Sequence, residues 1–245
     1  MGAYCSQTTR SIIETLAFPT PSVSYNENHE NFLYVKNIAC MMYKNTSPIV
    51  IVYSHGNAVD IGRTHHFLKH LSIELNVNII SYDYIGYGLS RGKASELNCY
   101  ESIQCVCDFL LSEGFRNENI IFYGTSIGTG PSVDFCSKIK TCKGLLLQSP
   151  YTSIVGVQHK CIETSFETFE SNPNIFRNIE KIHLINSRIL ILHGMQDSLI
   201  NIRHSEELCA KSKNAKLIKL EHVGHNGIEN LHFEDIMKCL NELKF

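Results

Sequence analysis

Short apolar runs alternate with longer stretches of helical periodicity along most of the chain. Runs such as PIVIVYS, NIIFYG and RILILHG are apolar at consecutive positions, which is typical of parallel strands that are buried on both faces. Because the stretches between these runs have helical spacing, the alternation favours a mostly parallel sheet covered by helices. The predicted strands are residues 32–43, 49–54, 78–83, 119–123, 144–148, 188–193 and 216–221.

Two apolar stripes predict helices that pack on this sheet. In each stripe, apolar side chains recur every three or four residues, so that they line one side of a helix. We expect both stripes to face the sheet and to form part of the core. The first stripe consists of Leu97, Tyr100, Ile103, Val106 and Leu110, and the second of Ile236, Leu240 and Leu243.

The length of the chain predicts one large domain over residues 16–245. A chain of 245 residues lies within the range of a single α/β domain, and no linker or internal repeat divides it. Residues 151–187 are the least regular part and are rich in polar side chains. We expect a small cap there, over the active edge of the sheet, that leaves the site accessible.

The composition of the chain limits which partners it can bind and in which cellular compartment it can reside. The chain is 43% apolar and 19% charged, with a net charge of -2, which argues against a nucleic-acid partner. No stretch has the length of a membrane-spanning helix, and the start of the chain lacks the features of a signal peptide. The ten cysteines are scattered and are interpreted as reduced thiols inside the cell.

The first residues, MGAYCS, predict a lipid anchor within residues 1–15. Gly2 and Ser6 fit the N-myristoylation pattern, and Cys5 beside them is a candidate for S-palmitoylation. One myristoyl chain binds a bilayer only marginally, and few basic residues accompany it. We therefore expect two acyl chains, on Gly2 and Cys5, and a location on the cytoplasmic face of a membrane.

The pentapeptide GTSIG, which follows the predicted strand 119–123, contains a candidate nucleophile, Ser126. A sharp turn from strand to helix brings the two elements close together and requires small residues on both sides of the central serine. Gly124 and Gly128 meet that requirement. The helix that follows would place its positive dipole end beside Ser126. Taken alone, the pentapeptide also fits an ordinary turn.

A catalytic serine needs a base to accept its proton and an acid to orient that base. Asp197 and His225 each lie within a few residues of a predicted strand end, where the ligands of a parallel sheet gather. The order Ser126, Asp197, His225 is the order of the α/β-hydrolase triad. The sequence leaves open His222 as the base, and Asp83 or Glu221 as the acid.

Acyl transfer also requires donors that face the developing oxyanion. One donor is usually the N–H of the residue after the nucleophile, here Ile127, and the second comes from an early loop after a strand, here Asn57. His55 beside it is interpreted as a structural part of the turn.

Nothing in the sequence predicts a metal or a cofactor. His66 and His70 have the spacing of one helical face, near His65, but no carboxylate or cysteine completes a ligand set nearby. A Rossmann glycine pattern and a P-loop are both absent from the sequence.

Five segments together resemble a known family: SHGNAVDIG, SYDYIGYGLSRGKASE, NIIFYGTSIGTGPSVD, ILILHGMQD and GHN. They are similar to the α/β-hydrolase-domain branch that contains membrane-anchored protein depalmitoylases, with the BEM-like serine hydrolases as neighbours. The resemblance implies an α/β-hydrolase fold and a serine hydrolase that acts on S-acyl (palmitoyl) cysteine in membrane proteins. By matching motif positions, it assigns the nucleophile to Ser126, the acid to Asp197 and the base to His225.

The chain departs from this branch at its start, where the branch has a cysteine-rich segment and this chain has Cys5 beside Gly2. The leading hypothesis is a lipid-anchored palmitoyl-protein thioesterase with an acyl-enzyme intermediate. One alternative is a lipid ester hydrolase of the monoacylglycerol or lysophospholipid lipase type, against which the short cap argues. The other is a membrane-bound interaction module without activity, against which the full set of triad residues argues.

Overall fold

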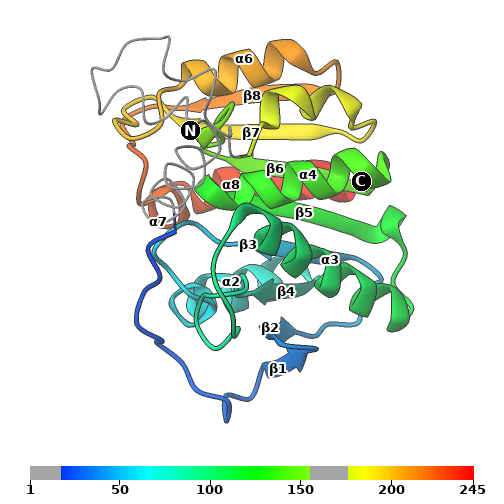
Figure 1. Ribbon diagram of the computed structural model, residues 1–245. Coiled ribbons are helices and arrows are strands. Elements are labelled where there is room, and N and C mark those ends of the chain that lie inside the picture. Colours follow the sequence, from blue (N-terminus) through cyan, green and yellow to red (C-terminus); the bar gives the residue numbers. More distant parts are fainter. Residues whose placement is uncertain (1–17, 155–175) are drawn as a thin grey trace, which may run out of the picture.

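A computed structural model describes residues 18–154 and 176–245, which are built around one eight-stranded sheet (Figure 1). The strand order is β1-β2-β4-β3-β5-β6-β7-β8. The predicted lipid anchor, including Gly2 and Cys5, and most of the predicted cap lie outside the described residues. The strands are β1 (Phe32–Val35), β2 (Ile38–Tyr43), β3 (Val50–Ser54), β4 (Asn78–Tyr82), β5 (Ile120–Thr125), β6 (Gly144–Gln148), β7 (Ile189–Gly194) and β8 (Ala215–Leu220).

The sheet is mostly parallel, as the apolar runs predict. Strands β3 to β8 pair in parallel, whereas β2 is antiparallel to both β1 and β4. The prediction of a single strand over residues 32–43 is wrong, because the chain reverses at Lys36 and Asn37 to form a hairpin. Lys36 adopts a φ of 56° there, a left-handed conformation that glycine or asparagine usually supplies.

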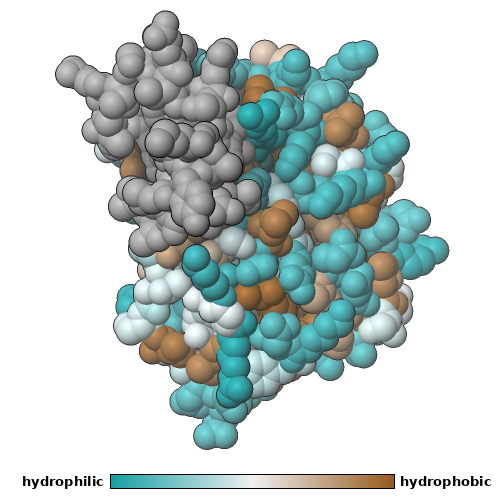
Figure 2. All heavy atoms as spheres, in the orientation of Figure 1, coloured by the Kyte–Doolittle hydropathy of each residue, from teal (hydrophilic) through white to brown (hydrophobic). Residues whose placement is uncertain are grey.

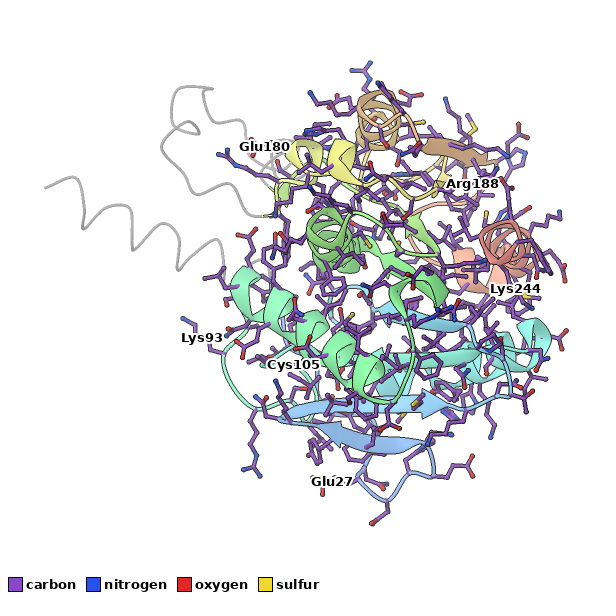
Figure 3. All side chains as sticks on the ribbon, turned by 90° about the vertical axis from the view of Figure 1, so that its right-hand side faces the viewer. Glu27, Lys93, Cys105, Glu180, Arg188 and Lys244 are labelled. Atoms are coloured by element: carbon purple, nitrogen blue, oxygen red, sulfur yellow. The ribbon has the colours of Figure 1, made fainter. Side chains whose placement is uncertain are left out.

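Helices cover both faces of the sheet (Figures 1 and 3). One apolar cluster joins the sheet to α3, α4 and α6, and a second joins it to α2 and α8. The described helices of four or more residues are α2 (Ile61–Leu75), α3 (Glu96–Ser112), α4 (Thr129–Ile139), α6 (Arg203–Lys211), α7 (Ile228–Leu231) and α8 (Phe233–Lys244). Short 3-10 turns add η1 (Asn117–Asn119), η2 (Ser126–Gly128), η4 (Asn178–Glu180) and η5 (Ile182–Leu184).

The stripe on α3 is buried along most of its length, but not at its start. Ile103, Val106 and Leu110 are fully buried, whereas Leu97 is 65% exposed. Leu97 lies six residues before Ile103, which places it about 120° away around the helix. Cys99 takes the buried position in that turn instead. The expectation that Leu97 faces the sheet is therefore wrong.

The surface in Figure 2 is mainly polar, with separate small apolar patches. Within residues 18–154 and 176–245, none of the helices combines the length and apolar character that crossing a bilayer requires. The eight cysteines in this part of the chain are all free thiols, and most of them are buried.

Candidate active site

Ser126 lies in a sharp turn between β5 and α4. Its φ of 52° is in the left-handed region, which is strained for a residue with a side chain. The glycines on either side are required by close packing. A Cβ added at Gly128 would lie 2.1 Å from the Ser54 carbonyl oxygen, and one added at Gly124 would lie 2.6 Å from the Gly128 carbonyl oxygen. GTSIG is therefore a compressed turn that presents the serine.

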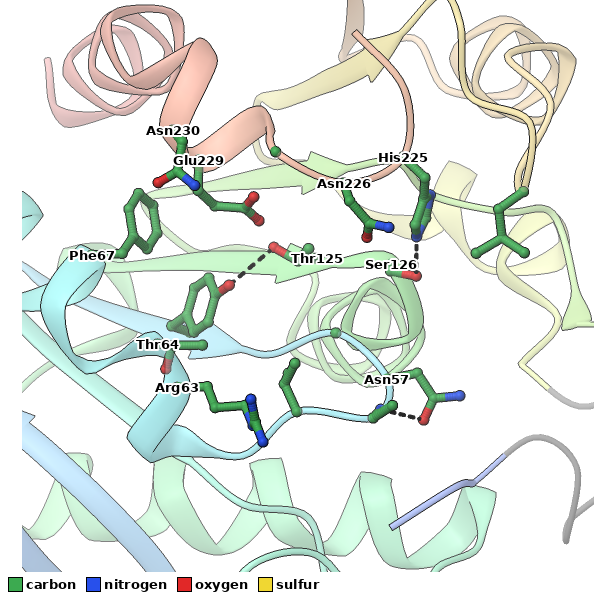
Figure 4. A pocket seen from close by; sticks show the side chains of 16 residues that line it. Asn57, Arg63, Thr64, Phe67, Thr125, Ser126, His225, Asn226, Glu229 and Asn230 are labelled. Atoms are coloured by element: carbon green, nitrogen blue, oxygen red, sulfur yellow. Dashed lines mark hydrogen bonds between the residues drawn. The ribbon is translucent and has the colours of Figure 1, made fainter. Parts of the chain in front are cut away.

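The structure brings the three residues of the predicted triad together. His225 Nε2 lies 3.0 Å from Ser126 Oγ (Figure 4), and His225 Nδ1 lies 2.7 Å from Asp197 Oδ2. Asp197 follows β7 and His225 follows β8, so both reach Ser126 from the carboxyl edge of the sheet. The Asp197 carboxylate is fully buried, whereas the His225 side chain is 12% exposed. The line of hydrogen bonds is thus open to solvent at its serine end.

Asp197 is held as a carboxylate by several donors. The N–H groups of Leu199 and Ile200 donate to Oδ1 at 2.9 and 2.7 Å, and His193 Nε2 lies 3.3 Å from Oδ2. Burial opposes ionisation of Asp197, but the hydrogen bonds from His193, His225 and Ile200 outweigh it and lower its pKa below the usual value. A low pKa keeps the acid ionised beside His225 at neutral pH.

His193 is a contact of Asp197 that the sequence analysis did not identify. Its Nε2 lies 2.9 Å from the Ile200 carbonyl oxygen, which can only accept, so Nε2 carries a hydrogen. Ser205 Oγ lies 2.6 Å from its Nδ1. The spacing of His193 and Asp197 in HGMQD, four residues apart at the end of a buried strand, is the signal that could have indicated this contact.

The alternative base and acid lie in other surroundings. His222 and Glu221 are 87% and 78% exposed and lie 3.9 Å from each other. Asp83 is fully buried beside His55, at the ends of the neighbouring strands β3 and β4. Of the candidates weighed, Asp197 and His225 are the pair that is hydrogen-bonded in line with Ser126.

The two predicted oxyanion residues both lie next to the serine. Ile127 follows Ser126 in η2, and Asn57 belongs to the loop after β3. A Cβ added at Gly56 would lie 3.8 Å from Ser126 Cβ, so the loop passes close to the nucleophile. Asn57 and Ser126 line the same cavity.

Tyrosines from the end of β4 and the segment after it hold the end of β3 and this loop in place. Ser54, His55 and Asn57 each contact one tyrosine hydroxyl, and the three tyrosine side chains are buried. The contacts are Tyr82 Oη with Ser54 Oγ at 2.7 Å, Tyr84 Oη with the His55 carbonyl oxygen at 2.6 Å, and Tyr87 Oη with Asn57 Oδ1 at 2.7 Å.

Asp83 adds a buried carboxylate beneath the same loop. Its Oδ1 lies 3.2 Å from His55 Nε2 and accepts the Ile61 N–H at 3.0 Å. Its Oδ2 accepts a hydrogen bond from Tyr25 Oη. His55 Nδ1 in turn lies 2.8 Å from the Gly56 carbonyl oxygen. Asp83 therefore joins the oxyanion loop, the start of α2 and the segment before β1.

A cavity of about 520 Å³ opens beside Ser126 and His225 (Figure 4). Its wall combines apolar side chains with charged and amide side chains from α2, α7 and the loops between them. The apolar part includes Tyr53, Val59, Phe67 and Leu199, and the polar part includes Arg63, Thr64, Asn226, Glu229 and Asn230.

The histidines that were considered as metal ligands make other contacts. His65 Nδ1 lies 3.0 Å from Tyr43 Oη, and the His70 ring stacks on Phe233 with centroids 4.7 Å apart. In the part of the chain that the structure describes, no three His, Cys, Asp or Glu side chains are grouped so as to hold a metal ion.

Known proteins similar to this chain are α/β hydrolases. No protein-family model matches the chain. The human alpha/beta hydrolase domain-containing protein 17B is 39% identical over 197 residues, which cover 78% of this chain and 66% of the human protein, slightly less than two thirds. A protein of Acanthamoeba polyphaga mimivirus, named provisionally as an alpha/beta hydrolase, is 37% identical over 73% of this chain and 67% of its own length.

Solved structures agree with these relatives at the level of the fold. The Pyrococcus furiosus esterase Pf2001 superposes with a TM-score of 0.73 at 14% identity, covering 93% of this chain and 95% of the esterase. The mouse alpha/beta hydrolase domain-containing protein 10 gives a TM-score of 0.66 at 16% identity, over 86% of this chain and 96% of its own. The chain belongs to the α/β-hydrolase family.

Proposed function

We propose that this protein is a serine hydrolase that cleaves S-acyl cysteine thioesters in membrane proteins. The observation that carries the proposal is the line of hydrogen bonds from Asp197 through His225 to Ser126, which ends at an open cavity. Membership of the α/β hydrolases supports hydrolysis. The thioester substrate rests on the motif resemblance to protein depalmitoylases.

The geometry supports a two-step mechanism. His225 Nε2 takes the proton of Ser126 Oγ as that oxygen attacks the acyl carbonyl carbon, and the Asp197 carboxylate stabilises the resulting imidazolium. The N–H groups of Ile127 and Asn57 stabilise the oxyanion. The carbon–sulfur bond then breaks, the sulfur takes the proton from His225, and the cysteine leaves as a thiol. Water, deprotonated by the same histidine, releases the fatty acid from Ser126.

Labelling with a fluorophosphonate probe tests the nucleophile. Wild-type protein should be labelled, whereas Ser126→Ala should not, because the probe reacts only with an activated serine. Ser132→Ala is a matched control, since Ser132 is a buried serine near the site that donates to the Gly128 carbonyl oxygen. An unlabelled wild-type protein that is folded contradicts the serine hydrolase, and labelling that survives Ser126→Ala contradicts the choice of nucleophile.

Turnover of matched substrates tests the thioester. We expect palmitoylated cysteine peptides to be hydrolysed with a higher kcat/KM than monoacylglycerol or lysophospholipid carrying the same acyl chain. The opposite ranking would favour the lipid ester hydrolase.

We also propose that acyl chains on Gly2 and Cys5 hold the protein at the cytoplasmic face of a membrane. Replacing Gly2 by Ala should move the protein into the soluble fraction of a cell lysate, because the remaining chain has no myristoyl group to direct it. Unchanged membrane partitioning would contradict this anchor without affecting the proposed chemistry.

A further inference from the structure

The cavity beside Ser126 contains an anchored carboxylate that the proposed mechanism does not use. Glu229 lies on α7, four residues after His225 along the chain, and its side chain extends into the cavity (Figure 4). The chain turns between them at Gly227, whose φ of 93° favours a residue without a side chain. The same turn therefore delivers His225 to the serine and Glu229 to the cavity wall.

A buried chain of hydrogen bonds fixes the position of this carboxylate. Tyr123 Oη donates to Gln148 Oε1 at 2.5 Å, and Gln148 Nε2 donates to Glu229 Oε1 at 2.8 Å. Tyr123 and Gln148 are fully buried, so neither can rotate freely. Glu229 is thus an anchored carboxylate in the cavity that also contains Ser126.

The lining of the cavity is mixed, and its polar part, around Glu229, indicates which half of a thioester lies there. A fatty acyl chain gains free energy only by leaving water, and packing it against Glu229, Arg63 and the Asn226 and Asn230 amides would remove water from these groups without replacing their hydrogen bonds. A peptide with its own polar groups can replace them. The polar part of the cavity therefore fits the leaving side of the thioester better than it fits the acyl chain.

Building on the proposed function, we propose that this cavity binds the leaving group and that Glu229 selects leaving groups that carry a cation. In a protein substrate, the cation is a lysine or arginine side chain close to the acylated cysteine. Arg63 lines the same cavity from α2, on the wall opposite Glu229 in Figure 4. The positive charge of Arg63 repels a cation on that wall, so a cationic leaving group is favoured only beside Glu229.

A matched pair of thioesters tests this selection. S-octanoylthiocholine and the octanoyl thioester of 3,3-dimethylbutanethiol have leaving groups of the same shape, and they differ by a quaternary nitrogen in place of a carbon. We expect wild-type protein to prefer the cationic thioester by about tenfold in kcat/KM, a typical value for one partly exposed charge contact. Release of the free thiol gives both rates.

Three variants locate the source of the preference. Glu229→Gln keeps the shape of the side chain and should reduce the preference below about threefold, which is the part that a neutral cavity retains. Arg63→Gln should increase it. Glu234→Gln, which removes a carboxylate on the exposed start of α8, should leave it unchanged. Equal rates in wild type, or a preference that survives Glu229→Gln, overturn the inference.

The inference and the proposed function fail in different ways. If wild-type protein cleaves both thioesters at the same rate, the thioesterase stands and the selection by Glu229 is overturned. If it cleaves neither, the thioesterase is overturned. The selection is then measured with two phosphonothiolates that carry the same two leaving groups. These reagents inactivate the protein by reacting with Ser126 and require no turnover of a thioester. Equal inactivation rates, or no inactivation by either reagent, then overturn the selection as well.

Discussion

Two buried aspartates at the same edge of the sheet each lie beside a histidine, and the two pairs have different surroundings. In the first pair, Asp197 binds His225 Nδ1 and leaves Nε2 facing Ser126. In the second, Asp83 lies beside His55 Nε2, while His55 Nδ1 is taken by the Gly56 carbonyl oxygen. His55 Nε2 thus faces a buried carboxylate, Nδ1 is engaged by the backbone, and the ring is fully buried.

The difference teaches that a buried carboxylate next to a histidine does not by itself indicate a catalytic pair. General base catalysis requires a ring nitrogen within reach of the proton to be moved, and only His225 of the two meets that condition. The Asp83 pair instead stabilises the loop that carries Asn57. We expect the Asp197–His225 pair to move protons and the Asp83–His55 pair to hold the backbone of the loop after β3.

The largest expected effect separates the pairs by activity. Asp197→Asn should lower kcat by about 10⁴, because the amide stabilises the wrong tautomer of His225 and leaves the imidazolium without a counter-charge. Asp83→Asn should lower kcat by no more than about tenfold, through a less ordered oxyanion loop. Steady-state rates with one acyl-cysteine peptide measure both. Equal losses in the two variants would remove the distinction between the pairs.

For the free energy of unfolding, we expect the opposite order, with the larger loss in Asp83→Asn. Asp83→Asn should lower the free energy of unfolding by about 3 kcal/mol, because it disturbs a buried charge that His55, Tyr25 and the Ile61 N–H all contact. Asp197→Asn should cost less, since the site tolerates an amide that accepts the same backbone hydrogen bonds. Urea titrations followed by circular dichroism give both values. A smaller loss in Asp83→Asn than in Asp197→Asn would contradict the structural role.

Much of the fold follows from the sequence because the strands buried on both faces leave long apolar runs. The strand β6 lies where it is predicted, and β3, β4, β5, β7 and β8 differ by only a few residues at their ends. The hairpin between β1 and β2 was missed because Lys36, rather than the glycine or asparagine that usually marks such a turn, takes the left-handed position. Residue spacing could not distinguish two short strands from one long strand.

The candidate site was predictable where chemistry depends on chain position. Polar residues directly after buried strands indicated Ser126, Asp197 and His225, because strand ends converge at one edge of a parallel sheet. Contacts between distant side chains left no such signal. Gln148 and Glu229 are 81 residues apart, and nothing in the residues between them indicates that they meet. Burial and direction of individual side chains had to come from the structure.

Acid should reduce the contribution of Asp197 to the free energy of unfolding. The folded protein lowers the pKa of Asp197, so the stability that it contributes is complete above the unfolded value of about 4 and is lost as the pH falls toward the folded value. The advantage in unfolding free energy of wild type over Asp197→Asn should therefore shrink below about pH 4. Urea midpoints at pH 7, 5, 4 and 3 measure it. A difference that is constant over this series would mean that the carboxylate is not stabilised in the folded state.

The smallest expected effect concerns a single hydrogen bond to the oxyanion loop. Tyr87→Phe removes the hydroxyl that donates to Asn57 Oδ1 at 2.7 Å and keeps the ring that packs beside His55 and Tyr84. Loss of one neutral hydrogen bond should cost about 1 kcal/mol. If the bond positions Asn57 for the oxyanion, this cost appears mainly as a fall in kcat of about fivefold, with KM nearly unchanged. Tyr34→Phe is a matched control, because Tyr34 lies on the edge strand β1 and its hydroxyl donates to the exposed Glu27. An equal fall in kcat for both variants, or a cost confined to unfolding, would show that the tyrosine supports the loop without tuning the reaction.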